Sequence, residues 1–347
     1  MSTLKSLHYI RSLPEGVIQG EEVSISTKRI LEEAENLGIT WEILPNTEMI
    51  RLSYKDNVQI VKNRLPNTTS KNAYEVCHDK QICKMILEKA GLEGMPGFLI
   101  YKEDTEVRIK SMWDALQKPL VLKPSKGSHG DGVIVGLTDF SECVGKIREY
   151  FETPLYEGGL ILEEMFVGKE YRILATPEKV LAVIERIPAH VIGDGKHTIE
   201  QLIEIENRNP IRNINEFIYP HLALNETSFK LLRAQKLTPE SVPENGQHVV
   251  LQKISNIMAG GVAIDRTDEV HESVKRIAIE ATRAIPGLSW TGIDFMTKDV
   301  YKPQSKGTYT IIEMNHAPGF DMHDMPMQGE PRGVTKEFLY LMFPELR

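Results

Sequence analysis

The glycine-rich stretch at residues 119–137, PLVLKPSKGSHGDGVIVGL, has the residue types of a phosphate-binding loop. Two apolar runs flank a short loop that contains two glycines, which predicts a β-hairpin. The small side chains of the loop leave backbone N–H groups free to close over an anion such as a polyphosphate. Lys123 ends the first run, where its ammonium group could reach the same phosphates. An ordinary surface hairpin is an equal interpretation, because the stretch matches neither of the two common phosphate-loop motifs.

Two late apolar segments carry oxygen ligands. Residues 290–296 contain Asp294, and residues 309–315 contain Glu313 and Asn315. Residues i and i+2 of a strand point to the same face, so Glu313 and Asn315 lie side by side and Asp294 can add a third ligand from a neighbouring strand. Carboxylate and amide oxygens, completed by water and phosphate oxygens, suit Mg²⁺. The other residues of 309–315 predict a central, buried strand, where acids serve a site more often than solvent; exposed acids at a strand end are the alternative.

A pair of arginines is expected between two further strands. Residues 170–175 and 180–188 have strand character on either side of a turn at 176–179. Antiparallel pairing across that turn puts Arg172 roughly opposite Arg186, an arrangement that is destabilising for like charges. It is explained if an anion such as phosphate lies between the two guanidinium groups. The alternative is that each arginine pairs with a nearby glutamate.

Alternating helices and strands must position these groups. The first 72 residues predict a small α/β unit in which no chemistry is evident. One helix is expected over residues 73–90, and it carries Lys80. Further helices follow from the spacing of apolar residues at 139–150, 199–207 and 272–284.

Composition narrows the class of protein. A chain of 347 residues with 41% hydrophobic and 26% charged residues is typical of a soluble globular protein with two or three subdomains. The net charge of -8 argues against a nucleic-acid binder. We find neither an apolar run of about 20 residues that could span a membrane nor a signal-peptide core. The three cysteines, Cys77, Cys83 and Cys143, lack metal-ligand spacing, so we expect reduced thiols in a cytoplasm.

Seven motifs in chain order resemble the ATP-grasp ligases, in particular the ATP-grasp module of cyanophycin synthetase and the glutathione synthetase half of the fused bacterial glutathione enzyme. The resemblance runs from about residue 28 to the end of the chain. The motifs are DK at 79–80, VLKPSKGSHGDGV at 121–133, ILEEMFVGKEYRIL at 161–174, ERIPAHVIGDGKHTIEQLIEIENRNP at 185–210, NIMAGGVAIDRTDEVH at 256–271, GIDFM at 292–296 and IIEMNHAPG at 311–319.

The resemblance implies an α+β ATP-grasp fold, in which two α+β lobes grip ATP behind a reduced N-terminal α/β domain. The implied boundaries are residues 1–72 for the N-terminal domain, 73–165 for the small lobe with the glycine-rich phosphate loop, and 166–347 for the C-terminal lobe. The C-terminal lobe would carry the metal site and an inserted lid at about 190–250.

The resemblance also implies a role for each matching residue. Arg172, Arg186 and Asn256 would face the γ-phosphate and an acyl phosphate. Mg²⁺, with Mn²⁺ as the alternative, would be held by Asp294, Glu313 and Asn315. The residues implied to bind ATP are Lys80 and Lys123 on the phosphates, Gly127, Ser128, His129, Gly130 and Gly132 in the phosphate loop, Glu163, Glu164, Met165 and Phe166 in the hinge strand against adenine, and Glu170 on the ribose.

The implied reaction is ATP-dependent formation of an amide bond between amino acids or small peptides. A carboxylate is a poor electrophile, so ATP first phosphorylates it, and an amine then attacks the acyl phosphate. A stand-alone glutathione synthetase-type ligase, a kinase-like enzyme and a non-catalytic nucleotide-binding protein are the alternatives. Because the other domains of both relatives are missing, we expect one ATP-grasp unit to act alone, as a homo-oligomer without nucleic-acid or membrane partners. The run IMAGG after Asn256 and the pair Phe320-Asp321 depart from the cyanophycin enzymes and put the substrate in doubt.

Overall fold

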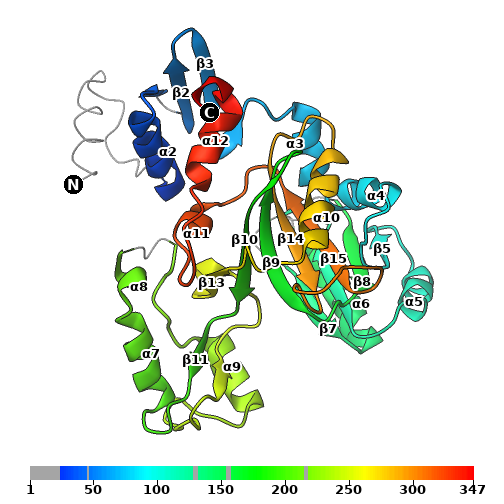
Figure 1. Cartoon of the computed structure of the whole chain (residues 1–347). Coiled ribbons are helices and arrows are strands. Elements are labelled where there is room, and N and C mark those ends of the chain that lie inside the picture. The colour runs from blue at the N-terminus through cyan, green and yellow to red at the C-terminus, as the bar shows by residue number, and fades with distance from the viewer. Residues whose placement is uncertain (1–23, 45–46, 128–131, 154–157, 215–217) are drawn as a thin grey trace.

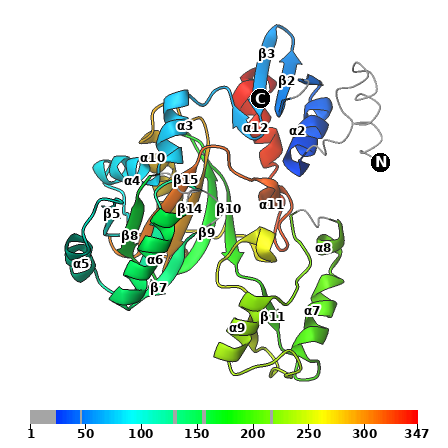
Figure 2. The ribbon, with the colours of Figure 1, turned by 180° about the vertical axis from the view of Figure 1, so that it is seen from behind.

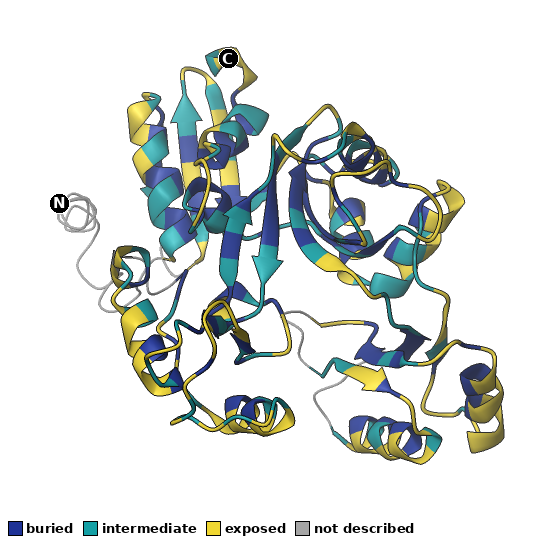
Figure 3. Ribbon diagram, turned by 60° about the horizontal axis from the view of Figure 1, so that its bottom comes forward, coloured by how far each residue is buried: buried dark blue, intermediate teal, exposed yellow. Residues whose placement is uncertain are grey.

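The computed structural model describes residues 24–44, 47–127, 132–153, 158–214 and 218–347 (Figure 1). Its elements form an N-terminal sheet, a small-lobe sheet, a large five-stranded sheet and a module of helices and a two-stranded sheet at the far end. Buried residues gather on the strands and on the inner faces of the helices, while exposed residues follow the outer helix faces (Figure 3). The α+β class predicted from the sequence is confirmed.

The N-terminal sheet is an antiparallel meander with the order β1-β2-β3-β4. Its strands are β1 Thr40–Ile43, β2 Met49–Tyr54, β3 Asn57–Lys62 and β4 Leu65–Pro66. The helix α2 (Ile25–Asn36) begins at the side-chain cap Ser24 and buries Ile30 against this sheet. The helix α12 (Val334–Met342), from the other end of the chain, contributes Phe338 to the same core. The N-terminal unit therefore depends on a C-terminal helix for its packing.

The small-lobe sheet has the antiparallel order β5-β8-β6-β7. Its strands are β5 Gly97–Ile100, β6 Leu120–Pro124, β7 Ile134–Leu137 and β8 Leu160–Glu164. The pairing of Leu122 with Ile134 confirms the hairpin predicted at residues 119–137. The helices α5 (Glu106–Asp114) and α6 (Phe140–Glu152) complete its core, and α6 lies over the sheet when the molecule is seen from behind (Figure 2).

The large sheet has the order β13-β10-β9-β14-β15. Its strands are β9 Lys169–Ala175, β10 Val180–Ile187, β13 Val262–Asp265, β14 Thr291–Thr297 and β15 Tyr309–Asn315. The prediction that residues 309–315 form a central strand was wrong, because β15 is the last strand of this sheet. Its apolar residues are nevertheless buried, since helices pack on the face where Ile311 and Met314 lie.

Three helices cover that apolar face, namely α3 Lys71–His78, α4 Lys80–Lys89 and α10 Glu272–Arg283. The single helix expected over residues 73–90 is therefore two helices, α3 and α4. The break falls at Asp79, whose carboxylate accepts hydrogen bonds from the backbone N–H groups of Gln81 and Ile82 and so begins α4. This cap places Lys80 in the first turn of α4, at the edge of the site.

A separate module lies where an inserted lid was expected, at about 190–250. It contains β11 His190–Ile192, α7 Ile199–Asn207, α8 Pro210–Ile214, α9 Glu226–Ala234 and β12 His248–Val250. Buried residues such as Val191, Leu202, Leu232 and Val249 give it a small core of its own. Its role as a lid and the three domain boundaries stay proposals.

The remaining short elements connect the sheets. They are η1 Ile257–Ala259, α11 Asp321–Asp324 and η2 Pro344–Leu346. Among the described residues, no helix is long and apolar enough to cross a membrane.

Candidate active site

One face of the large sheet is apolar and the other carries charges. On β9, Tyr171 and Ile173 enter the core, so Arg172 between them points to the opposite face. In the strand register, Asp294 of β14 lies opposite Arg172 and also opposite Glu313 of β15. Three adjacent strands therefore place an arginine and two carboxylates in a row across the sheet.

The register of β9 and β10 differs from the prediction that the two arginines lie opposite each other. Arg172 lies opposite Ile184, and Arg186 lies opposite Glu170. The two arginines are thus diagonal neighbours on one sheet face. This spacing separates their charges more than direct opposition would, and both side chains still reach the same carboxylate, as follows.

The anion shared by the two arginines in this structure is the carboxylate of Asp294. Its Oδ1 lies 3.2 Å from Nη1 of Arg172 and 3.0 Å from Nη2 of Arg186. Arg186 also pairs with Glu170. Burial alone would raise the pKa of Asp294, but the two guanidinium groups outweigh it and hold that pKa below its ordinary value. Gly292 leaves room for this cluster, because a Cβ there would lie 3.0 Å from Nη1 of Arg172.

The expected metal ligands lie together. Glu313 and Asn315 share a face of β15, and Nδ2 of Asn315 donates to Oε1 of Glu313 at 3.2 Å. The donor set of two carboxylates and one amide is chemically suited to Mg²⁺. Within the described residues, no group of three or more His, Cys, Asp or Glu side chains could hold a metal ion by itself. The set Asp294, Glu313 and Asn315 would therefore need water or phosphate oxygens to complete a metal site.

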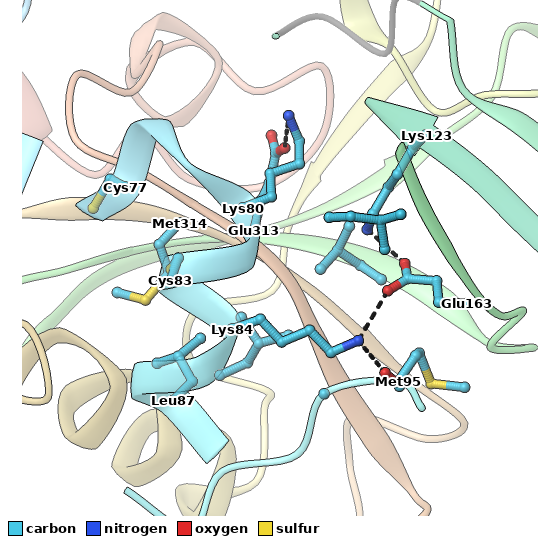
Figure 4. Close-up of a pocket in the computed structure, with 14 residues that line it drawn as sticks. Cys77, Lys80, Cys83, Lys84, Leu87, Met95, Lys123, Glu163, Glu313 and Met314 are labelled. Atoms are coloured by element: carbon cyan, nitrogen blue, oxygen red, sulfur yellow. Dashed lines mark hydrogen bonds and ion pairs between the residues drawn. The ribbon is translucent and has the colours of Figure 1, made fainter. Parts of the chain in front are cut away.

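Three lysines meet two glutamates in the cavity between the small-lobe sheet and α4 (Figure 4). Nζ of Lys123 lies 2.5 Å from Oε1 of Glu163, and Nζ of Lys84 lies 3.2 Å from Oε2 of the same carboxylate. Nζ of Lys80 donates to the carbonyl oxygen of Gly127 at 2.5 Å and lies 3.8 Å from Oε2 of Glu313. Three positive charges against two negative ones leave one net positive charge for an anionic ligand.

Lys80 connects this cavity to the acidic cluster. Burial lowers the pKa of its ammonium group, and Glu313 offsets part of that effect. The ammonium group therefore lies between the start of the glycine-rich loop and a candidate metal ligand.

The described residues include two glycines of the expected phosphate loop, Gly127 and Gly132. Ser128, His129 and Gly130 lie outside the described residues. Gly132 follows them with a φ of 69°, and its carbonyl oxygen accepts a hydrogen bond from Tyr150.

The expected hinge and ribose-binding residues continue from β8. Glu164 accepts a hydrogen bond from the backbone N–H of Gln117, and Met165 and Phe166 are half-buried. Glu170 accepts from Ser255 as well as pairing with Arg186.

The described contact of the Asn256 side chain is a helix cap. Its side chain accepts a hydrogen bond from the backbone N–H of Met258 at 3.0 Å and so begins η1. This contact gives Asn256 a structural role, while its expected contact with the γ-phosphate stays a prediction.

Sequence reasoning missed Lys84 and Arg64. Lys84 follows Lys80 by four residues, so their shared face of one helix was a readable signal. Arg64 lies between β3 and β4, where no chemistry was expected. Its Nη1 donates to Ser26 at 3.3 Å and its Nε to the carbonyl oxygen of Ala317 at 3.4 Å. This cation of the N-terminal sheet therefore reaches the segment that follows Asn315, which no local pattern indicates.

The buried imidazole of His323 gives the site a pH-dependent stability. The side chain is fully buried, and neither ring nitrogen has a hydrogen-bond partner in the described structure. Burial lowers its pKa to about 3, with Arg172 and Arg186 lowering it and Asp265 raising it. The folded state therefore keeps this imidazole neutral, whereas the unfolded chain protonates it near pH 6.5.

We expect the free energy of unfolding to fall as the pH drops below about 6.5, because only the unfolded chain then gains the proton. His323 contributes about 1.4 kcal/mol per pH unit over this window, down to its folded pKa. Urea unfolding at pH 7, 6 and 5 measures the effect. In the variant His323→Gln, stability should depend less steeply on pH between 6.5 and 5. Equal slopes for the variant and the parent would contradict this assignment.

Comparison with known proteins finds two groups of curated relatives. It is 35% identical over 321 residues to a cyanophycin synthetase of Geminocystis herdmanii, a match that covers 92% of this chain and 36% of the relative. It is 36% identical over 340 residues to the glutathione biosynthesis bifunctional protein GshAB of Enterococcus faecalis, covering 94% of this chain and 43% of the relative. The chain thus spans less than half the length of these curated relatives. No protein-family model matches it.

Solved structures agree on the fold. A bifunctional glutathione synthetase from Pasteurella multocida superposes with a TM-score of 0.72 at 28% identity, covering 93% of this chain and 44% of its own. A D-alanine–D-alanine ligase from Bacillus anthracis superposes with a TM-score of 0.50 at 17% identity, covering 80% of this chain and 70% of its own. The second match bears on the fold alone.

Proposed function

We propose that this chain, which has the ATP-grasp fold and is homologous to cyanophycin synthetases and bifunctional glutathione synthetases, is an ATP-dependent carboxylate–amine ligase. Its substrates are amino acids or small peptides, and its products are an amide, ADP and phosphate. The observation that carries the proposal is the convergence of Arg172, Arg186, Asp294 and Glu313 on one sheet face, with Lys80 3.8 Å from Glu313. Side-chain cations that could bind phosphate and carboxylates that could bind a metal ion therefore meet on this sheet face.

The reaction has two steps. A carboxylate oxygen of the first substrate attacks the γ-phosphorus of ATP, which forms an acyl phosphate and breaks the bond to ADP. The amine of the second substrate then attacks the carbonyl carbon, phosphate leaves with the bonding electrons, and the amine proton passes to solvent. Both steps develop negative charge on phosphate oxygens, so positioned cations are the main requirement of the site.

The described residues supply those cations. Lys80 and Lys123 would bind the phosphates of ATP, because their ammonium groups line the cavity between the lobes. Arg172 and Arg186 would hold the acyl phosphate, since both point to the face beside Asp294. Asp294, Glu313 and Asn315 would hold Mg²⁺ or Mn²⁺, which when bound neutralises phosphate charge.

The expected cellular compartment follows from the state of the cysteines. The three cysteines are free and buried, which supports a reducing cytoplasm. A homo-oligomer stays a prediction that analytical ultracentrifugation would test.

A substrate screen tests the proposed function. The chain is incubated with ATP, Mg²⁺ and pairs of amino acids or dipeptides, ADP is measured, and products are identified by mass. We expect one pair to release ADP together with an equal amount of amide. A phosphorylated acid without amide would identify a kinase instead. Binding of ATP without ADP release from any pair would support a nucleotide-binding protein without turnover.

A further inference from the structure

Lys84 has no role in the ATP site described so far, yet it contacts the centre of that site. It lies on α4, and its ammonium group points to Glu163 and to the carbonyl oxygen of Met95 (Figure 4). Gly94 lets the side chain pass, because a Cβ at that position would lie 3.3 Å from Cε of Lys84. The side chain of Lys84 is 17% exposed and that of Glu163 is 7% exposed, so the contact lies mostly away from solvent.

The two lysines bind different oxygens of the same carboxylate. Lys123 contacts Oε1 of Glu163, and Lys84 contacts Oε2. Each contact can therefore be lost without breaking the other. This arrangement matters because the side chain of Lys123 is only 7% exposed, and Glu163 is its ion-pair partner in the described structure.

Binding of a nucleotide phosphate by Lys123 requires that its ammonium group leave Glu163 or share it. A buried carboxylate that loses its only counterion is strongly destabilised. Lys84 removes that obstacle, because it stays on Oε2 when Oε1 is released. Without Lys84, Glu163 would have Lys123 as its sole ion-pair partner among the described residues and would compete with the phosphate for it.

We propose that Lys84 is a positioning residue that retains Glu163 and so frees Lys123 to bind a phosphate of the nucleotide. The inference rests on the proposed ATP site, and it concerns nucleotide binding rather than the ligase reaction. Lys84 should therefore matter only for ligands that carry a phosphate to attract Lys123.

Direct titration of the full chain with MgATP and with adenosine tests the proposal. Lys84→Met should weaken MgATP binding by roughly tenfold, the size of one coupling between adjacent charged groups, and should leave adenosine binding nearly unchanged. The matched control Lys110→Met removes an exposed lysine that pairs with Asp114 outside the cavity, and should change neither affinity. Thermal unfolding checks that each variant is folded. Equal losses for MgATP and adenosine would overturn the proposal.

A double variant separates positioning from simple structural support. Glu163→Gln removes the charge that competes for Lys123, so Lys84→Met combined with Glu163→Gln should bind MgATP about as tightly as Glu163→Gln alone. If Lys84→Met weakens MgATP binding in the Glu163→Gln background as much as it does in the parent chain, Lys84 only supports the local structure and the proposal fails. ADP release with substrate pairs, measured on the unaltered chain, tests the ligase reaction separately. A chain that binds MgATP but makes no amide would leave the role of Lys84 intact.

Discussion

Glu313→Ala is expected to abolish ADP formation, by about a thousandfold or more, while the chain stays folded. The carboxylate of Glu313 lies opposite Asp294 in the strand register, accepts a hydrogen bond from Asn315 and lies 3.8 Å from Nζ of Lys80. Its removal would take away one of the two carboxylates proposed for the metal ion and would remove the ion-pair partner that Lys80 has among the described residues. Loss of a preorganised charge at a phosphoryl-transfer site has effects of about this size.

The decisive measurement is ADP release over a range of Mg²⁺ concentrations. Glu313→Gln keeps the shape of the side chain but removes its charge, so its activity should also fall and should require more Mg²⁺. Glu152→Ala, an exposed position at the end of α6, is the matched control and should behave as the parent. Near-normal turnover in Glu313→Ala would mean that the metal assignment is wrong.

Arg186→Ala should lower the maximal rate by about a hundredfold to a thousandfold and change the affinity for ATP by no more than about threefold. The guanidinium group lies 3.0 Å from Asp294 on the charged sheet face, and Arg186 is not among the residues that line the cavity with Lys80 and Lys123. If it stabilises the acyl phosphate, its contribution appears only as that charge develops. Arg186→Lys keeps the positive charge but loses the planar guanidinium group with its paired N–H donors. Its maximal rate should therefore lie between those of Arg186→Ala and the parent.

Two measurements decide the role of Arg186, namely MgATP affinity by titration and turnover at saturating substrates. Arg276→Ala, which removes an exposed arginine of α10 that pairs with Glu280, provides the control for loss of charge alone. A large loss of MgATP affinity at an unchanged maximal rate would assign Arg186 to the nucleotide, and the acyl-phosphate role would be withdrawn.

Local spacing was sufficient to predict the parts of the site. The two apolar runs around the loop at residues 119–137 form the hairpin β6–β7, and Glu313 and Asn315 share a face of β15. Both features depend on the period of two residues in a strand and on turn chemistry, which neighbouring residues determine. The fold was implied by the resemblance of the ordered motifs to a known family rather than by spacing.

Tertiary packing decided how those parts meet. Continuing the pairing of Val180 with Ala175 would set Arg172 opposite Val183, and the irregularity between Val180 and Ala182 moves it by one residue to Ile184. This one-residue shift puts Arg186 on the same sheet face as Arg172. A shift of this kind depends on the strand's packing and cannot be counted from the turn. The anion between the arginines is Asp294, which lies more than 100 residues away in the sequence.

Three further features also depend on contacts between distant segments. The strand β15 is buried although it lies at the sheet edge, because α3 and α4 cover it. Arg64 reaches the segment after Asn315 only because the N-terminal sheet packs there. Lys84 meets Glu163 because α4 and the small-lobe sheet enclose one cavity. The sequence by itself thus determined most of the groups that the site contains, but not Lys84 and Arg64. Their ion-pair and hydrogen-bond partners were decided by how the sheets and helices pack, since such contacts join residues that no local pattern relates.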